Sequence, residues 1–295
     1  MRARAVGVVG VGNMGLAMAL RLLELGNEVR VRDVEPAREA LAVGAGGHAA
    51  ATPVELAVRC DAVIVAVVDA AQTEAVLFGS DGVAAAASGA CLVLCPTIAP
   101  DSVASFTTRL DALGRDWIEA PMSGGPARAR AGSMSLLVAC RDDVFERHAA
   151  LLAALADPVF RLGQRAGDGA RAKLVNNLLA AINLAGAAEA LALAERVGLD
   201  PARMLDVIER SSGQSWIGSD RMRRAVAGDL APRAHTTLLA KDSALALAMA
   251  AGTGVVPQLG SVAAATFAAA IDAGHGADDD ASLLAFLRDR FRSAG

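Results

Sequence analysis

Residues 5–33 read AVGVVGVGNMGLAMALRLLELGNEVRVRD and carry the clearest local pattern in the chain. Residues 5–9 form an apolar, partly β-branched run that ends at Gly10, which predicts a buried strand. The glycine-rich segment that follows leads into a stretch whose apolar residues recur at helical spacing. A second strand is predicted over residues 28–32, and it ends at Asp33, 23 residues after Gly10. The order is therefore strand, glycine turn, helix, strand and acidic residue.

This order and spacing predict a Rossmann unit that binds a dinucleotide. Gly10 allows the tight turn, Gly12 lets the backbone approach a pyrophosphate, and Gly15 lets the helix pack closely on the strand. The turn also contains Asn13 and Met14, which lie where the helix begins. Free N–H groups and the helix dipole favour an anion at that position. All five residues are predicted to bind the cofactor.

Asp33 is predicted to select the form of the cofactor. Its carboxylate would accept hydrogen bonds from the adenosine ribose hydroxyls and repel a 2'-phosphate, which favours NAD over NADP. Arg32 and Arg38 lie close by in the sequence and would attract that phosphate. NAD is therefore the expected cofactor, with NADP as the weaker alternative.

Strands continue to alternate with helices after residue 33, a pattern typical of a doubly wound parallel sheet and thus of an α/β fold. Val67, Val68 and Asp69 follow one strand, and Pro96 and Thr97 follow the next. Because ligands of such sheets bind beyond the carboxyl ends of the strands, these residues are expected to line the cofactor. The predicted strands are residues 62–68, 91–95, 117–119, 135–139 and 159–162, and the predicted helices are residues 71–78 and 100–113.

One loop, residues 119–126, reads EAPMSGGP. Ser123, Gly124 and Gly125 offer a hydroxyl group and bare backbone amides, a combination that suits a carboxylate. Taken alone, the same residues also fit an ordinary turn.

Strand signals vanish after residue 167, which predicts an all-helical second domain. The first of its helices is long, because residues 170–197 are rich in Ala and Leu and contain no Pro. Lys173 and Asn177 are four residues apart, so they lie one turn from each other on the same face. An amine and an amide on an apolar helix must face water or a polar cavity. The predicted domains are residues 1–164, which bind the dinucleotide, and residues 165–295.

The predicted helices of the second domain are residues 170–197, 201–210, 215–226, 238–251, 256–273 and 282–291. The long first helix also suggests a subunit interface, so a homodimer or homotetramer is expected. A monomer that buries this helix internally is the alternative.

Composition narrows the classes of function. The chain has 295 residues and a net charge of −4, which gives no nucleic-acid footprint. Its apolar runs are expected to be interrupted before they reach membrane-spanning length, so we expect a cytoplasmic protein. Four cysteines without metal-ligand spacing are expected in the core, and the scattered histidines support no metal site. The acidic run 278–280 is expected to be a solvated loop and helix cap.

Three motifs in order, GVGNMG, EAPMSGG and GDGARAKLVNN, resemble those of the β-hydroxyacid dehydrogenase family. A fourth, AKDSALALAMA at residues 240–250, looks like a helix of the same family. The resemblance covers essentially the whole chain. It implies a fold like that of 6-phosphogluconate dehydrogenase, with a Rossmann domain followed by a helical domain. It also implies a dehydrogenase that acts on a small hydroxy acid with NAD(P).

The resemblance also implies roles for single residues. Lys173 would be the catalytic lysine and Asn177 its substrate-orienting partner. Lys241 would border the nicotinamide and the substrate, and Thr97 would touch the nicotinamide. Ser123, Gly124 and Gly125 would hold the substrate carboxylate. Trp216 resembles a pocket residue of the family. The alternative is that it is an aromatic residue that packs between helices.

Chemistry is consistent with these implied roles. Oxidation of an alcohol requires a base for the hydroxyl proton as hydride leaves for the nicotinamide. Lysine can serve only when neutral, and burial together with the positive charge of Lys241 would both favour the neutral form.

Three segments, residues 69–79, 212–234 and 276–284, look more like enzymes that oxidise L-threonate than like those that oxidise 3-hydroxyisobutyrate. The expected reaction is therefore L-threonate to its 2-oxo acid. The alternatives are 3-hydroxyisobutyrate or tartronate semialdehyde as substrate, and more distantly a protein that senses NAD without catalysis.

Overall fold

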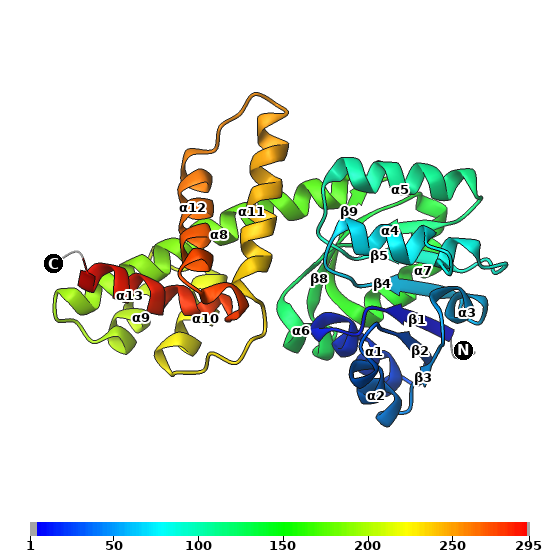
Figure 1. Ribbon diagram of the computed structural model, residues 1–295, viewed down its shortest axis with the longest axis horizontal. Coiled ribbons are helices and arrows are strands. Elements are labelled where there is room, and N and C mark those ends of the chain that lie inside the picture. The colour runs from blue at the N-terminus through cyan, green and yellow to red at the C-terminus, as the bar shows by residue number, and fades with distance from the viewer. Residues whose placement is uncertain (1–4, 294–295) are drawn as a thin grey trace. The chain divides into compact units, whose positions relative to one another are not determined.

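The computed structural model describes residues 5–293. The chain divides into two compact units, Met1–Lys173 and Leu174–Gly295. The division falls within the long helix α8 (Asp168–Arg196), whereas the boundary expected from the sequence lies between residues 164 and 165. Figure 1 shows strands and helices in the first unit and helices in the second.

Unit 1 contains a nine-stranded sheet within the described residues, in the order β3-β2-β1-β4-β5-β6-β8-β7, with β9 paired to β8. Parallel pairing runs from β3 through β6. This confirms the predicted α/β class with a mainly parallel sheet. The strands are β1 (Ala5–Val9), β2 (Glu28–Arg32), β3 (His48–Ala49), β4 (Ala62–Val65), β5 (Cys91–Leu94), β6 (Trp117–Glu119), β7 (Met122–Ser123), β8 (Met134–Ala139) and β9 (Ala156–Gly163).

One part of the sheet departs from the parallel prediction. β8 runs antiparallel to both β6 and β7, and only β9 lies parallel to it. The connection from β7 to β8 holds the short helix α6 (Gly125–Ala131). It is too short for a parallel crossover, which needs roughly a dozen residues or more. The chain therefore turns back on itself directly after the SGG loop.

Helices lie on both sides of the sheet (Figure 1). In the first helix, α1 (Asn13–Glu24), the residues Gly15, Met18, Ala19 and Leu22 are buried and have the spacing of a single helix face. The four cysteines are buried and unpaired, and burial raises the pKa of each thiol. The remaining elements of unit 1 are α1 (Asn13–Glu24), α2 (Pro36–Gly44), α3 (Pro53–Val58), α4 (Ala70–Phe78), η1 (Val83–Ala85), α5 (Pro100–Ala112) and α7 (Asp142–Leu155).

Unit 2 packs its helices around a core of its own. Phe267 is fully buried there, among leucines and alanines that include Leu184 and Leu284. The antiparallel helices α11 and α12 lie side by side (Figure 1). The elements after α8 are α9 (Pro201–Glu209), α10 (Trp216–Val226), α11 (Thr236–Ala251), α12 (Gln258–Asp272), η2 (His275–Ala277), η3 (Asp280–Ser282) and α13 (Leu283–Ser293).

The helix α8 lies where the sequence predicts it, within two residues of the expected bounds 170–197. Within residues 5–293 it alone is long and apolar enough to cross a membrane by length and composition. Its apolar sequence is nevertheless interrupted by Gly186 and Glu189, as expected, because the criterion is an average over the window. In α8, 39% of the most apolar window is buried inside the protein, and the core helix of a soluble protein passes the same test.

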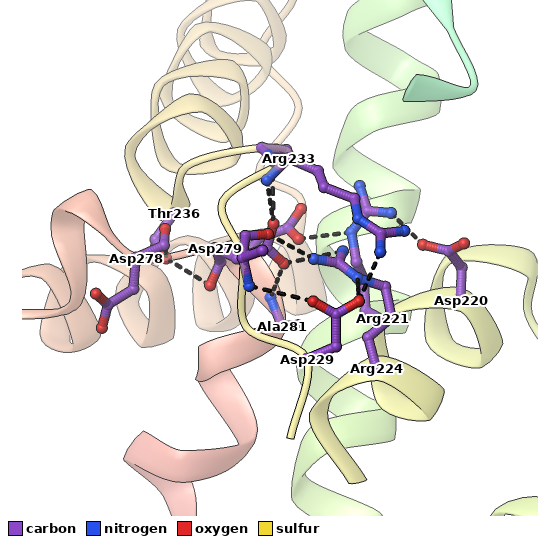
Figure 2. Close-up of polar contacts among 12 residues, drawn as sticks. Asp220, Arg221, Arg224, Asp229, Arg233, Thr236, Asp278, Asp279 and Ala281 are labelled. Carbon is purple, nitrogen blue, oxygen red and sulfur yellow. Dashed lines mark hydrogen bonds and ion pairs between the residues drawn. The ribbon is translucent and has the colours of Figure 1, made fainter. Parts of the chain in front are cut away.

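Two residues of the acidic run 278–280, Asp279 and Asp280, are buried inside unit 2, while Asp278 is exposed (Figure 2). Asp279 accepts hydrogen bonds from the N–H groups of Arg233, at 2.7 Å, and Ala281, at 3.1 Å. The guanidinium of Arg224 lies 3.1 Å from the same carboxylate. The predicted helix cap is present, because Asp279 caps η3. The predicted solvated loop was wrong for Asp279 and Asp280, which are both buried.

Arginines explain why these carboxylates are buried. Arg221 lies 2.5 Å from Asp280, and a buried charge is tolerated only beside such a partner. Burial raises the pKa of Asp280 to about 6 despite this arginine. Burial acts in the same direction on Asp279, but its hydrogen bonds outweigh that effect and lower its pKa. The network thereby ties the loop before α11 to α10 and η3.

Candidate active site

The glycine turn of unit 1 is close-packed at one end and open in the middle. Gly10 has φ +89°, and a Cβ on Gly15 would lie 1.8 Å from the carbonyl oxygen of Gly10. A Cβ on Gly12 would meet nothing within 4 Å. Asn13 is exposed and Met14 half-buried at the start of α1. The turn therefore fits a dinucleotide pyrophosphate, which would approach the backbone at Gly12.

Asp33 ties the end of β2 to this turn. Its carboxylate accepts hydrogen bonds from the N–H of Val11 at 2.6 Å and from the N–H of Glu35 at 3.0 Å. Arg32 next to it forms an ion pair with Glu39 at 2.8 Å. Asp33 thus shapes the backbone that a cofactor would contact, and the charge of Arg32 already has a partner.

The strand-end residues predicted to line the cofactor follow β4 and β5. Val67 is half-buried and Val68 is exposed, while Asp69 caps α4 by accepting a hydrogen bond from the N–H of Gln72 at 2.8 Å. Thr97 is half-buried beyond the end of β5. All of them lie past the carboxyl ends of neighbouring parallel strands.

The SGG loop takes a backbone path that requires glycine. Ser123 ends β7, and the next two residues have φ +127° at Gly124 and +78° at Gly125. A Cβ at Gly125 would meet nothing within 4 Å, so glycine is needed there for its conformation and not for space. All three residues are half-buried, and a hydroxyl group together with glycine amides is a combination that suits a small anion.

Glu119, at the end of β6, was quoted in the loop motif but received no role from the sequence. It is buried, and its carboxylate accepts hydrogen bonds from Gly167 N–H at 2.9 Å and from Ala170 N–H at 2.6 Å. Burial raises its pKa to about 7, although these hydrogen bonds act in the opposite direction. Only the fold places this carboxylate against the first turn of α8.

Lys173 is the last residue of unit 1 and is buried, with 7% of its surface exposed. The chain has only two lysines among its 28 basic residues, and the other is Lys241. Both lie in motifs that the family resemblance singles out. Asn177 follows one turn later on α8 and is also buried.

In unit 2 one carboxylate links Asn177 and Lys241. Asp242 on α11 accepts a hydrogen bond from Asn177 Nδ2 at 2.6 Å and one from Lys241 Nζ at 2.8 Å. Asn176 donates to the side-chain oxygen of Asn177 at 3.1 Å. Asp242 is itself buried, so the cluster is a fixed polar group within an apolar helical unit.

Trp216 begins α10 and is 49% exposed. This exposure does not match an aromatic residue fully enclosed between helices. Ser215 just before it caps α10 by accepting the N–H of Gly218 at 3.1 Å. The side chain of Ser215 therefore stabilises the start of α10.

Replacing Asp242 with Asn is expected to lower kcat/KM about 10- to 100-fold, because a lost buried charge partner costs about 1–3 kcal/mol. The amide nitrogen of the new asparagine would face Asn177 Nδ2 or Lys241 Nζ, which are themselves hydrogen-bond donors. Steady-state kinetics measures this effect. Ser243→Ala is the matched control, since it removes a buried hydrogen bond from the next residue of α11, to Leu239 O at 2.8 Å. Equal losses in both variants would contradict a specific role for Asp242.

Comparison with known proteins decides the family. The model of the NAD binding domain of 6-phosphogluconate dehydrogenase matches residues 5–163. The model described as NAD-binding of NADP-dependent 3-hydroxyisobutyrate dehydrogenase matches residues 167–287. The chain belongs to the β-hydroxyacid dehydrogenase family. It therefore binds a nicotinamide dinucleotide.

Relatives with known names agree with this assignment. The chain is 38% identical to the L-threonate dehydrogenase of Cupriavidus necator, over 95% of each chain. It is 33% identical to the 3-hydroxyisobutyrate dehydrogenase of Pseudomonas aeruginosa, over 97% of this chain and 99% of the relative. Its fold matches the crystal structure of 3-hydroxyisobutyrate dehydrogenase from Salmonella typhimurium with a TM-score of 0.90 and 34% identity, covering 96% and 99% of the two chains.

These findings show that the protein is a hydroxyacid dehydrogenase, which sets aside the alternative of a sensor without catalysis. One solved structure was determined with a cofactor of this class, a nicotinamide dinucleotide. This structure, Psf3 in complex with NADP+ and 2-OPP, is 27% identical with a TM-score of 0.86, covering 96% of this chain and 99% of that one.

Proposed function

We propose that the protein oxidises L-threonate to its 2-oxo acid with NAD. The observation that carries this proposal is the Asn177–Asp242–Lys241 cluster, a set of fixed polar groups in unit 2, of which Asn177 follows Lys173 by one turn of α8. A polyhydroxylated acid needs such partners, because a buried hydroxyl without a hydrogen bond is costly. The L-threonate dehydrogenases of Cupriavidus necator and Escherichia coli K12, 38% and 35% identical, support the same substrate.

Lys173 would act as the base and, in the reverse direction, as the acid. Its amine would take the proton of the hydroxyl group next to the carboxylate. Asn177 would orient that hydroxyl, since Asp242 and Asn176 fix its amide. Ser123 and the amides of the SGG loop would hold the substrate carboxylate. The nicotinamide, when bound, accepts the hydride.

A panel of acids tests the substrate. NADH formation is followed with L-threonate, D-threonate, D-erythronate, 3-hydroxyisobutyrate and glycerate, and tartronate semialdehyde is tested as substrate for reduction. We expect the highest kcat/KM with L-threonate. A higher value with 3-hydroxyisobutyrate or tartronate semialdehyde would overturn the proposed substrate while leaving the family and the lysine chemistry in place.

Asp33 supports NAD in preference to NADP. A 2'-phosphate beside this carboxylate would be repelled, and Arg32 is already paired with Glu39. The Asp33→Ser variant is expected to bind NADH about 10-fold more weakly, because the turn loses the acceptor of the Val11 N–H. We also expect it to gain affinity for NADPH.

Fluorescence titration with NADH and NADPH measures both changes. The double variant Asp33→Ser with Glu39→Gln frees the guanidinium of Arg32 from its ion pair. It should therefore bind NADPH more tightly than the single variant does. No gain of NADPH affinity in either variant would count against Asp33 as the selecting residue.

We further propose that the protein is a cytoplasmic homodimer or homotetramer. Val175 and Leu179 lie one turn apart on α8 and are 61% and 57% exposed, and Leu259 on α12 is 70% exposed. A second copy of the chain is the proposed cover, because apolar side chains of this size gain free energy when they leave water. Sedimentation equilibrium of the purified protein tests the assembly, and a monomer would contradict it.

A further inference from the structure

Glu119 ends a central strand and reaches the start of α8. It pairs with Leu94 on β5 and with Ala139 on β8, so its backbone is held on both sides in the sheet. Its side chain accepts hydrogen bonds from the N–H groups of Gly167 and Ala170, at 2.9 and 2.6 Å. These are among the N–H groups at the beginning of a helix that have no partner within it.

The close approach of helix and strand depends on a glycine. A Cβ on Gly169 would lie 2.7 Å from the carbonyl oxygen of Leu137 on β8 and 2.9 Å from Glu119 Cδ. The first turn of α8 therefore packs directly on the sheet, with the carboxylate as the connection. Any larger side chain at residue 169 would push the helix away from the strand.

Burying a carboxylate is unfavourable, and this one is almost fully buried, with 1% of its surface exposed. Burial accordingly raises the pKa of Glu119, and nearby Asp168 raises it further. Asp168 itself pairs with Arg171 at 2.7 Å. An apolar residue would avoid this cost but would leave the N–H groups of Gly167 and Ala170 without their acceptor. The carboxylate therefore anchors the start of α8 to the strand.

Glu119 connects two parts of the site described above. Ser123 follows it by four residues along the same short loop, and Lys173 follows Ala170 by three residues, about one helical turn. Both parts belong to unit 1. We propose that Glu119 is a positioning residue that fixes Lys173 relative to the SGG loop by holding the first turn of α8. The inference rests on the proposed role of Lys173 as acid and base.

Positioning is the relevant property, because a displacement of about 1 Å in a reacting group can cost about 100-fold in rate. Glu119 acts through the backbone of α8 and needs no contact with the substrate. Loss of Glu119 should therefore lower kcat and shift the pH dependence of acetylation of the Lys173 amine. It should leave the affinity for NADH unchanged.

The test compares Glu119→Gln with wild type and with the control Thr52→Ala. Thr52 caps α3 in the same unit by accepting the N–H of Glu55 at 3.2 Å, and it has no place in the proposed site. The glutamine keeps the shape of Glu119 but turns an N–H donor toward one of the two helix N–H groups. We expect kcat to fall about 10- to 100-fold in Glu119→Gln, with unchanged Kd for NADH, and to stay unchanged in Thr52→Ala.

A second readout needs no substrate. The two lysines, Lys173 and Lys241, carry the only side-chain amines in the chain, so mass spectrometry can follow acetylation of each separately. The pH dependence of labelling at Lys173 should shift in Glu119→Gln, while that at Lys241 should stay as in wild type. Gly169→Ala perturbs the same contact without removing the carboxylate and should give the same pattern, which covers the case that Glu119→Gln folds poorly.

The outcomes separate the inference from the proposed function. If wild type oxidises none of the tested acids, the proposed function fails, and labelling of Lys173 still decides the role of Glu119. If wild type is active but Glu119→Gln and Gly169→Ala match Thr52→Ala in kcat and in Lys173 labelling, the positioning role is overturned. If kcat falls only together with NADH affinity and Lys241 labelling, Glu119 supports the fold in general, which also overturns it.

Discussion

Lys173→Ala is expected to lower kcat about 100- to 10,000-fold while the Kd for NADH stays the same, because a positioned acid and base contributes about that factor. The amine is buried at the start of α8, and alanine leaves no group there that can accept the proton. The glycine turn and Asp33, which would bind the cofactor, lie on other elements. Steady-state kinetics and NADH fluorescence measure the two quantities.

Lys173→Arg separates the proton transfer from the positive charge. Arginine keeps the charge but stays protonated at any working pH, so it cannot act as a base. We expect it to be nearly as inactive as alanine. If Lys173→Arg retained most of the wild-type kcat, the residue would serve only to attract the substrate carboxylate, and the acid and base role would have to pass to another group.

The part of the fold that could be predicted from sequence is the part with strong local patterns. The strand, glycine turn, helix and second strand of residues 5–32 appear where predicted, and β6 has the predicted bounds. Buried parallel strands are continuous apolar runs, and they are easy to recognise between charged or glycine-rich segments.

Most of the elements absent from the prediction have weak patterns. The exception is α7, which buries Val144, His148, Leu151 and Leu155 at helical spacing and was nevertheless not predicted. The helix α2 buries only Ala42, and α3 has six residues, so neither shows the repeated apolar stripe of a longer helix. The strand β7 is two residues long. The antiparallel course of β8 depends on pairing between strands, which no local periodicity encodes.

The site shows the same division. Its glycines and Lys173 belong to motifs that can be recognised in the sequence, whereas Glu119 and the linking position of Asp242 depend on contacts between distant segments. Glu119 and Ala170 are 51 residues apart, and Asn177 and Asp242 are 65 apart. The burial of Asp279 was missed for the same reason, because its partner Arg224 lies on a different helix.

Two glycines of one turn are expected to respond differently to the same substitution. Gly15→Ala would place a methyl group 1.8 Å from the carbonyl oxygen of Gly10, so the backbone itself must move. We expect this to destabilise the protein without cofactor by about 3 kcal/mol. The corresponding fall in Tm is about 6–12 °C. Binding of NADH should also be lost, because the turn no longer has its native form.

Gly12→Ala is the matched variant, because its methyl group would meet no protein atom within 4 Å. The Tm without cofactor should change little, since alanine in place of a glycine cap costs about 1 kcal/mol or less. Affinity for NADH should nevertheless fall strongly, because the methyl group occupies the space through which the pyrophosphate approaches the backbone. Thermal unfolding with and without NADH measures both properties. Equal Tm values for the two variants would show that Gly15 is not needed for packing, and full NADH affinity in Gly12→Ala would place the cofactor elsewhere.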